Sequence, residues 1–246
     1  GVVNVQAPSG GINVTANSTL IVGDAGTGVF NQSGGATNDV NLFVGNQATG
    51  NGTVNITGGV LSIAHNGDPG PTGVATVGHF GVGAVNQSNA DGPSTVTIGV
   101  GAPQFDSNNP GNPYGGYLFI GKNDGGAGTY TITDTGNGQP VTLTVGRDIQ
   151  IGGSNIDGFS CGGGQTCTGT FVQNGGTVNA AAVTIGIGNG SGSYTINSGT
   201  LNAFLDIGNT SGGNTFTQNG GTVNAGGMFL SNGAVLFGNP APNRYE

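Results

Sequence analysis

The 246-residue sequence predicts an all-β fold, a parallel β-helix (β-solenoid) of about eight 22-residue coils with loop insertions. Three observations lead to this prediction. The composition suits short strands and tight turns, one sequence motif recurs along most of the chain, and its period is shorter than the roughly 40 residues of a propeller blade.

The composition excludes a helical protein. Charged residues make up 6% of the chain, whereas an ordinary soluble domain has about 25%. Two of the strong helix formers, Lys and Glu, occur once each, at Lys122 and Glu246. The 55 glycines do not recur every third residue, and apolar runs are frequent, which argues against collagen and disorder. Thr, Val and aromatic residues between Gly, Asn and Asp clusters indicate many short strands.

The formal charge of −8 limits the classes of partner. Phosphate backbones are held by clustered Lys and Arg, and only Lys122, Arg147 and Arg244 are present, so we expect no nucleic-acid binding. Binding to an anionic membrane surface is disfavoured for the same reason. No apolar run reaches the length of about 18 residues that a membrane span needs. The chain starts at Gly1 without a signal peptide, which we interpret as a processed product.

Internal repetition carries most of the information. Residues 171–186 read FVQNGGTVNAAAVTIG, and residues 216–231 read FTQNGGTVNAGGMFLS. An Ile/Val-Gly dipeptide recurs with a shortest spacing of 22 residues, and Leu230-Ser231 takes its place at the end. Four longer spacings predict loop insertions at about 64–74, 100–116, 135–143 and 153–168. The dipeptides lie at Val22, Val44, Val77, Ile120, Ile151, Ile185 and Ile207.

Each repeat has room for three short strands, for example Thr170–Gln173, Thr177–Asn179 and Ala182–Ile185. Stacked coils align like residues, so an inward ladder is predicted from Phe30, Tyr130, Phe171, Tyr194 and Phe216, with Val54 and Val85 among them. An Asn recurs eight residues later, where we expect a coil corner with stacked amides: Asn38, Asn179, Asn202 and Asn224. The whole chain, 1–246, is predicted to be one domain, with 1–22 as first strand or coil and 232–246 as a C-terminal tail.

The two cysteines, Cys161 and Cys167, lie in a short glycine-rich hairpin. A zinc site needs four ligands, and neither His65 nor His79 has a second His or Cys nearby in the sequence. A disulfide needs only the two cysteines, so the disulfide is favoured over zinc. It would indicate an oxidising compartment.

Residues 185–202 follow the pattern Ile-Gly-x-x-x-Gly-x-Gly-x-Tyr-Thr-Ile-x-x-Gly-Thr-Leu-Asn. This repeat resembles that of autotransporter passenger domains and PEP-CTERM-associated proteins, most strongly over 171–231. The resemblance implies export from a Gram-negative bacterium and a role in adhesion or surface structure. A translocator barrel, a Pro-Glu-Pro sorting tag and an anchoring helix are not found in the sequence, so the resemblance does not supply an anchor.

The sequence predicts no catalytic site. Glycosidases use two carboxylates facing one cleft, whereas the ten Asp residues here are scattered, mostly in turns. We therefore expect a protein that is not an enzyme and has no cofactor. Calcium is the remaining alternative, because Asp106, Asn108 and Asp124 could supply oxygens, although the repeats-in-toxin signature is absent.

The predicted function is that of a structural subunit of an extracellular bacterial filament or surface matrix such as a biofilm. Both termini look like strands rather than caps, so we expect head-to-tail homopolymers formed through solenoid edges or by exchange of a terminal strand. The alternative is a monomeric adhesin or glycan-binding rod that contacts glycans or a host surface. Its candidate ligand-facing residues are Phe105, Tyr114 and Tyr117 in the second insertion.

Overall fold

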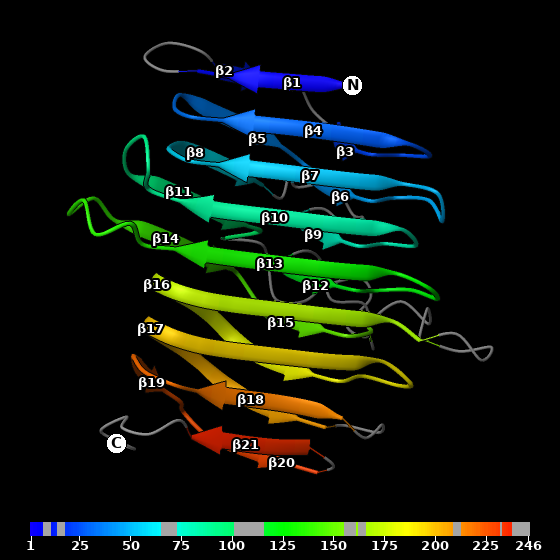
Figure 1. The fold of residues 1–246 in the computed structure, drawn as a ribbon, viewed down its shortest axis with the longest axis vertical. Coiled ribbons are helices and arrows are strands. Elements are labelled where there is room, and N and C mark those ends of the chain that lie inside the picture. Colours follow the sequence, from blue (N-terminus) through cyan, green and yellow to red (C-terminus); the bar gives the residue numbers. More distant parts are fainter. Residues whose placement is uncertain are drawn as a thin grey trace, which may run out of the picture.

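The computed structural model describes residues 1–6, 11–13, 18–64, 73–100, 116–154, 161, 166–208, 213–231 and 233–237. Regular structure in these ranges consists of 21 β-strands (Figure 1). Every pairing between them is parallel, and over most of the chain each strand pairs with the strands three places before and after it. The backbone hydrogen bonds therefore run along the long axis of the molecule.

The strands form three columns, and we call one set of three successive column positions a level. The first column contains β1 (Val2–Val5), β4 (Thr27–Gln32), β7 (Asn51–Ile56), β10 (Val82–Ser88), β13 (Ala127–Thr133), β18 (Asn214–Gln218) and β21 (Gly233–Phe237). The second contains β2 (Gly11–Asn13), β5 (Ala36–Asp39), β8 (Gly59–Ile63), β11 (Ser94–Ile98), β14 (Val141–Val145) and β19 (Thr222–Asn224). The third contains β3 (Thr19–Val22), β6 (Asn41–Val44), β9 (Val74–Val77), β12 (Tyr117–Ile120), β15 (Asp148–Ile151) and β20 (Met228–Leu230).

Two strands belong to all three columns. β16 (Thr168–Ile185) pairs successively with β13, β14 and β15, and β17 (Ser191–Ile207) pairs with β18, β19 and β20. Their mutual register shifts at three places, next to Gln173, Asn174 and Asn179. An extra residue in a strand bends it and increases its twist, so these strands pass the corners without leaving the hydrogen-bonded ladder.

This pairing corrects the predicted fold class. In place of a β-solenoid of about eight separate 22-residue coils with three short strands each, the molecule has one parallel sheet of 21 strands wrapped closed around a single core. The predicted strands 170–173, 177–179 and 182–185 are one continuous strand. The sequence did not reveal this because the Gly175-Gly176 pair reads as a turn, although both residues lie within β16.

The recurring Val/Ile-Gly dipeptide marks the end of the third-column strand. Val22, Val44 and Val77 are aligned by register, and so are their counterparts as far as Leu230. The following Gly45 has φ +69, and a Cβ there would lie 2.2 Å from the carbonyl oxygen of Val82. Only glycine combines the left-handed backbone with this close approach of the next strand.

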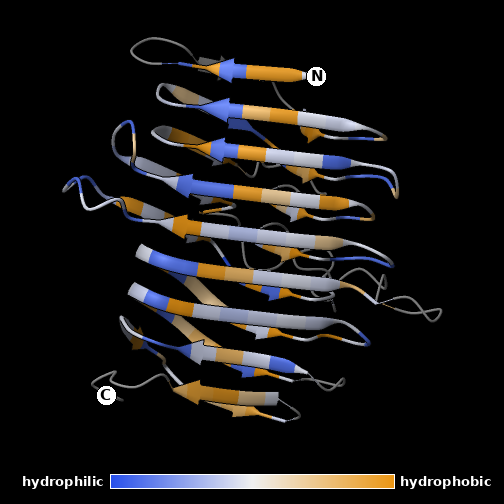
Figure 2. Cartoon of the chain, in the orientation of Figure 1, coloured by the Kyte–Doolittle hydropathy of each residue, from blue (hydrophilic) through white to orange (hydrophobic). Residues whose placement is uncertain are grey.

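The core consists of the inward side chains of all three columns. Burial alternates along the strands, as in β7 and β14, because successive side chains point to opposite faces. Figure 2 shows that apolar segments occur in strands along the whole length of the molecule, next to more hydrophilic ones. A second, small cluster of Val74, Tyr117 and Phe119 lies on the outer face of the third column.

Most residues of the predicted insertions 64–74, 100–116 and 153–168 lie outside the described residues, whereas 135–143 is described. Around this third insertion, Asn89 donates to Asp134 and to the carbonyl oxygen of Gln139, and it accepts from Thr135. Within the predicted C-terminal region 232–246, residues 233–237 form β21 against β18, in line with the expected strand-like terminus.

Candidate functional site: side-chain rows and the two ends of the sheet

The inward ladder occupies one register position of the first column. Phe30, Tyr130, Phe171, Tyr194 and Phe216 are all buried, with Val54 and Val85 between the first and second of them. Successive rings from Tyr130 to Phe216 have centroids 5.2, 4.6 and 5.4 Å apart, the first two pairs being nearly parallel. The ring stack from Tyr130 to Phe216 is therefore a packed structural element of the core.

Asparagine side chains form rows on the outer faces. In the second column, the Asn224 amide donates to Asn202 and the Asn202 amide to Asn179, both at 2.7 Å. Asn38 shares this register position but is separated from Asn179 by Ser62, Thr97 and Thr144. All four asparagines lie within strands, and Asn179 and Asn202 do so in the two strands that pass the corners. The register of β16 and β17 shifts directly after Asn179. The expected stacking of amides is found for Asn179, Asn202 and Asn224, which lie on consecutive levels.

Two further rows were not predicted. In the first column, Asn86, Asn55, Asn31 and Asn4 are linked at 2.8–2.9 Å, and a third row links Asn219, Asn197 and Asn174. In all three rows each amide nitrogen donates to the level nearer the N-terminus. All the hydrogen bonds of the rows therefore point the same way along the long axis of the molecule, from donor nitrogen towards the N-terminal end.

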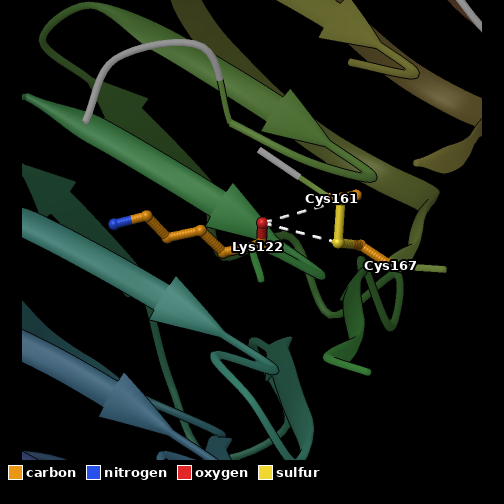
Figure 3. The surroundings of a disulfide bond; sticks show 3 residues. All are labelled: Lys122, Cys161 and Cys167. Atoms are coloured by element: carbon orange, nitrogen blue, oxygen red, sulfur yellow. Dashed lines mark hydrogen bonds between the residues drawn. A yellow bond between two sulfur atoms is a disulfide. The ribbon is translucent and has the colours of Figure 1, made fainter. Parts of the chain in front are cut away.

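The predicted disulfide between Cys161 and Cys167 is present. Both residues are buried, and their sulfur atoms lie 3.8 and 3.6 Å from the backbone carbonyl oxygen of Lys122 (Figure 3). The disulfide therefore packs against the corner that follows β12, and it serves to fix the chain rather than to bind a ligand.

The candidate ligand-facing residues are only partly described, since Phe105 and Tyr114 lie outside the described residues. Tyr117 is 3% exposed, so the expectation of an exposed ring is wrong. Its ring stacks on Phe119 with centroids 5.7 Å apart, and the Arg147 guanidinium lies 5.1 Å from its centroid. Burial raises the pKa of Tyr117 to about 12 and also raises the pKa of Asp148, against the lowering effect of Arg147.

The C-terminal end of the sheet leaves core-facing side chains in solvent. Met228 and Leu230 continue the register of Leu205 and Ile207, which are fully buried. Leu230 is nevertheless 54% exposed, because no further level lies over it among the described residues. In the first column Phe237 continues the buried position of Gln218 and is exposed as well.

The N-terminal end has the same property. Val3 continues the ladder position of Phe30, yet it is 45% exposed whereas Phe30 is buried. A cavity of about 390 Å³ opens beside it, lined by Leu20, Val22 and Phe30 among others. Figure 2 shows that β1, β20 and β21, the end strands, are largely apolar.

Outward positions at the ends are apolar too. Phe229 is 65% exposed and Ile21 is 46% exposed. Both occupy an outward register position that is held elsewhere by apolar and polar residues alike: Phe43, Thr76, Phe119, Gln150, Thr184 and Asp206. Neither residue was predicted from the sequence to have a special role. The signal was present, because the last repeat reads MFL where the previous one reads LDI.

Among the described residues no group of three or more His, Cys, Asp or Glu side chains could hold a metal ion. No helix in the described part of the chain is long and apolar enough to cross a membrane. Comparisons with protein-family models, curated proteins and solved structures gave no match.

Proposed function

We propose that the protein is a structural subunit of an extracellular bacterial filament or surface matrix in which copies stack end to end. The observation that carries the proposal is the exposure of core-facing apolar side chains at both ends, Val3 at one and Met228 and Leu230 at the other. The buried disulfide supports an oxidising compartment, as expected for an exported protein.

The free energy of burying the exposed end residues, set against the cost of association, favours an assembly that depends on concentration. Full burial of one Val, Leu, Ile, Phe or Met side chain contributes about 1.5–3 kcal/mol, whereas association costs about 4–15 kcal/mol. One such contact is not enough, but six half-exposed side chains from the two ends, together with backbone pairing, can exceed the cost. They are Val3, Ile21, Met228, Phe229, Leu230 and Phe237.

The two end surfaces differ, so a contact between them leaves one free surface of each kind. A heterologous contact of this type does not close on itself and propagates as a filament. Pairing of sheet edges also satisfies backbone groups that a free edge leaves unpaired.

Negative-stain electron microscopy across a concentration series tests the proposal. Wild-type protein should form filaments one molecule wide above a threshold concentration. Phe229→Asp should raise this threshold at least tenfold, because it places a charge in the contact. Val60→Asp is the matched control, since Val60 is an exposed outward residue in the middle of the second column.

Circular dichroism must show that both variants are folded. Short rods of wild-type protein at every concentration would contradict the proposal, and so would equal thresholds for the two variants.

A glycan-binding rod is the second candidate, and one corner favours it. His79 lies between Phe43 and Phe80, with ring centroids 5.1 and 4.4 Å away, and Phe80 is exposed. His79 Nδ1 lies 3.0 Å from Asn46 Oδ1, and Asn46 donates to Asp24. The corner thus combines aromatic and polar side chains, the two kinds of contact that ligand sites use.

Retention on a panel of immobilised polysaccharides tests this candidate. Phe80→Ala should abolish retention if the corner binds sugar, whereas Val82→Ala, at an exposed residue nearby, should leave it unchanged. Retention that is the same in both variants would exclude this corner.

A further inference from the structure

We propose that the outer face of the second column binds ice, through two rows of hydroxyl and amide side chains that follow five consecutive levels. The proposal concerns a side of the molecule and not its ends, so it does not depend on end-to-end stacking. It adds a ligand, crystalline water, that neither candidate function above includes.

The first row consists of threonine alone. The pairing register aligns Thr95 of β11 with Thr142 of β14, and the alignment continues through β16 and β17 to β19 (Figure 1). The residue that follows each threonine faces the core, whereas the threonines themselves point outward and are at least partly exposed. The row consists of Thr95, Thr142, Thr177, Thr200 and Thr222.

The second row lies two residues further along the same strands. It begins with Thr97 and Thr144 and continues with three asparagines. The Asn179 amide donates to the Thr144 hydroxyl at 3.5 Å, and Asn202 and Asn224 continue this chain of hydrogen bonds at 2.7 Å. Hydrogen bonds therefore orient most of the side chains of this row before any ligand arrives.

The two rows form an array whose spacings follow from strand geometry. Neighbouring parallel strands lie about 4.8 Å apart, and a step of two residues along a strand covers about 6.6 Å. Both distances are close to the repeats of the water lattice on a prism face of hexagonal ice. The register shifts of β16 and β17 fall outside residues 177–179, so the array continues through these two strands without a break.

Threonine presents both a hydroxyl and a methyl group to water on a stiff side chain. Its branched Cβ restricts rotation about χ1, and a preorganised surface loses little conformational freedom on binding. The hydroxyl can hydrogen-bond to a water molecule of the lattice. Water beside the methyl group must hydrogen-bond to other water molecules, as it does in ice.

The ten positions of the two rows are also neutral. No charged or aromatic residue occupies any of them, although the chain has a formal charge of −8. A charged group orients water around itself and would interrupt an ice-like layer. Sites for small organic ligands are lined mainly by apolar and aromatic side chains, which these rows lack. A neutral hydrogen-bonding face therefore fits a neutral water lattice better than a charged polymer or a sugar.

The first column provides an internal comparison. Thr129 and Thr131 on β13 have the same two-residue spacing and also point outward. On the next level, however, Val172 follows Thr131 in register, and the level before carries Ala84 and Asn86. The threonine pair on this face is therefore isolated from a continuous threonine row, and we expect the second column to bind ice more strongly.

Ice-affinity partitioning tests the proposal at a protein concentration below the filament threshold. The solution is frozen slowly around a cold probe, and the protein in the ice is compared with that in the remaining liquid. Wild-type protein should be enriched in the ice. Thr200→Tyr places a ring in the first row and should lower this enrichment at least tenfold, whereas the matched control Thr131→Tyr should leave it unchanged.

Circular dichroism must show that both variants are folded. The double variant Thr177→Ala/Thr200→Ala adds no volume and should give the same loss, which keeps the test decisive if the tyrosine prevents folding. Phe229→Asp, which acts on the end contact, should be enriched in ice as strongly as the wild type, so this proposal and end-to-end assembly can fail separately.

Exclusion of the wild-type protein from the ice would overturn the proposal. Equal enrichment of Thr200→Tyr and Thr131→Tyr would also overturn it, because the binding face would then lie elsewhere. Retention on cellulose or chitin powder that Thr200→Tyr abolishes, without enrichment in ice, would show that the rows bind a polysaccharide instead.

Discussion

From Tyr130 to Phe216, single residues in the core follow a pattern that links neighbouring levels. Tyr occupies the ladder where the preceding level carries Gln, and the hydroxyl groups of Tyr130 and Tyr194 donate to Gln87 and Gln173, both at 2.7 Å. Phe occupies it where the preceding level carries Ile, as with Phe171 over Ile132 and Phe216 over Ile196. Other levels depart from this pattern, since Val54 follows Gln32, Val85 follows Ile56 and Val235 follows Gln218. The Oε1 of Gln32 has no hydrogen-bond partner among the described residues.

Replacing Tyr194 by Phe should lower the free energy of unfolding by about 1–3 kcal/mol, because the buried Oε1 of Gln173 loses its donor. Denaturant unfolding measures the change. In the double variant Tyr194→Phe/Gln173→Ile, which copies the Phe-over-Ile pair of other levels, the coupling between the two sites should recover part of the loss. Additive losses would show that the hydrogen bond is not important for stability.

At Gly45 the left-handed backbone conformation disfavours any residue with a side chain, and the next strand leaves no space for a Cβ atom. Gly45→Ala should cost more than the about 1–2 kcal/mol of left-handed strain alone, because its Cβ would lie 2.2 Å from the Val82 carbonyl oxygen. Gly138→Ala is the matched control, since φ is +76 there and nothing lies within 4 Å of a Cβ. Equal losses of stability in the two variants would contradict the importance of close strand approach.

At the scale of the element, the strands keep their register while the corners vary. The Val/Ile-Gly strand ends and the inward ladder could be predicted from the sequence, because left-handed glycine and the two-residue pleat are local properties. Not predictable were the continuity of β16 through Gly175-Gly176, the burial of Tyr117 and the exposure of Leu230. Each of these depends on what lies over the residue in three dimensions.

The insertion that follows β13 (Ala127–Thr133) is fixed by an acidic group whose ionisation can be tested. Hydrogen bonds from the Gly136 backbone and from Asn89 lower the pKa of Asp134. An acid with a lowered pKa in the folded state stabilises the fold above its unfolded pKa, here 3.8, and this contribution is lost as the pH falls through the folded value.

The Asp134→Asn variant keeps a side-chain oxygen and the shape of the side chain, but it removes the ionisable carboxyl group. Its melting temperature should therefore fall less than that of the wild type between pH 5 and pH 2. Thermal unfolding followed by circular dichroism at several pH values measures this. An identical acid-induced fall in both proteins would show that Asp134 does not contribute to the pH dependence.

For the whole molecule, the net charge of −8 opposes assembly. The surface rows are neutral amides and hydroxyl groups, and the chain has only three Lys and Arg residues to offset the negative charge. Copies brought end to end therefore repel each other. The contacts proposed at the ends are apolar and do not depend on opposite charges. Salt should consequently favour assembly.

Raising NaCl from 10 to 150 mM shortens the screening length from about 30 to about 8 Å, so the threshold concentration for filaments should fall. Light scattering during a salt titration measures it, and Val60→Asp, which adds one negative charge away from the ends, should show a larger salt effect. A threshold that rises with salt would indicate ionic contacts between copies instead.

The corners have a practical consequence. Val22 and Val44 are 22 residues apart, whereas Val44 and Val77 are 33 apart, yet both pairs are aligned in the same column. Extra chain at a corner thus leaves the hydrogen-bonded ladder unchanged. Foreign peptides grafted between β8 and β9 should be displayed at intervals along the rod, which makes the protein a candidate scaffold for ordered vaccine epitopes or immobilised enzymes.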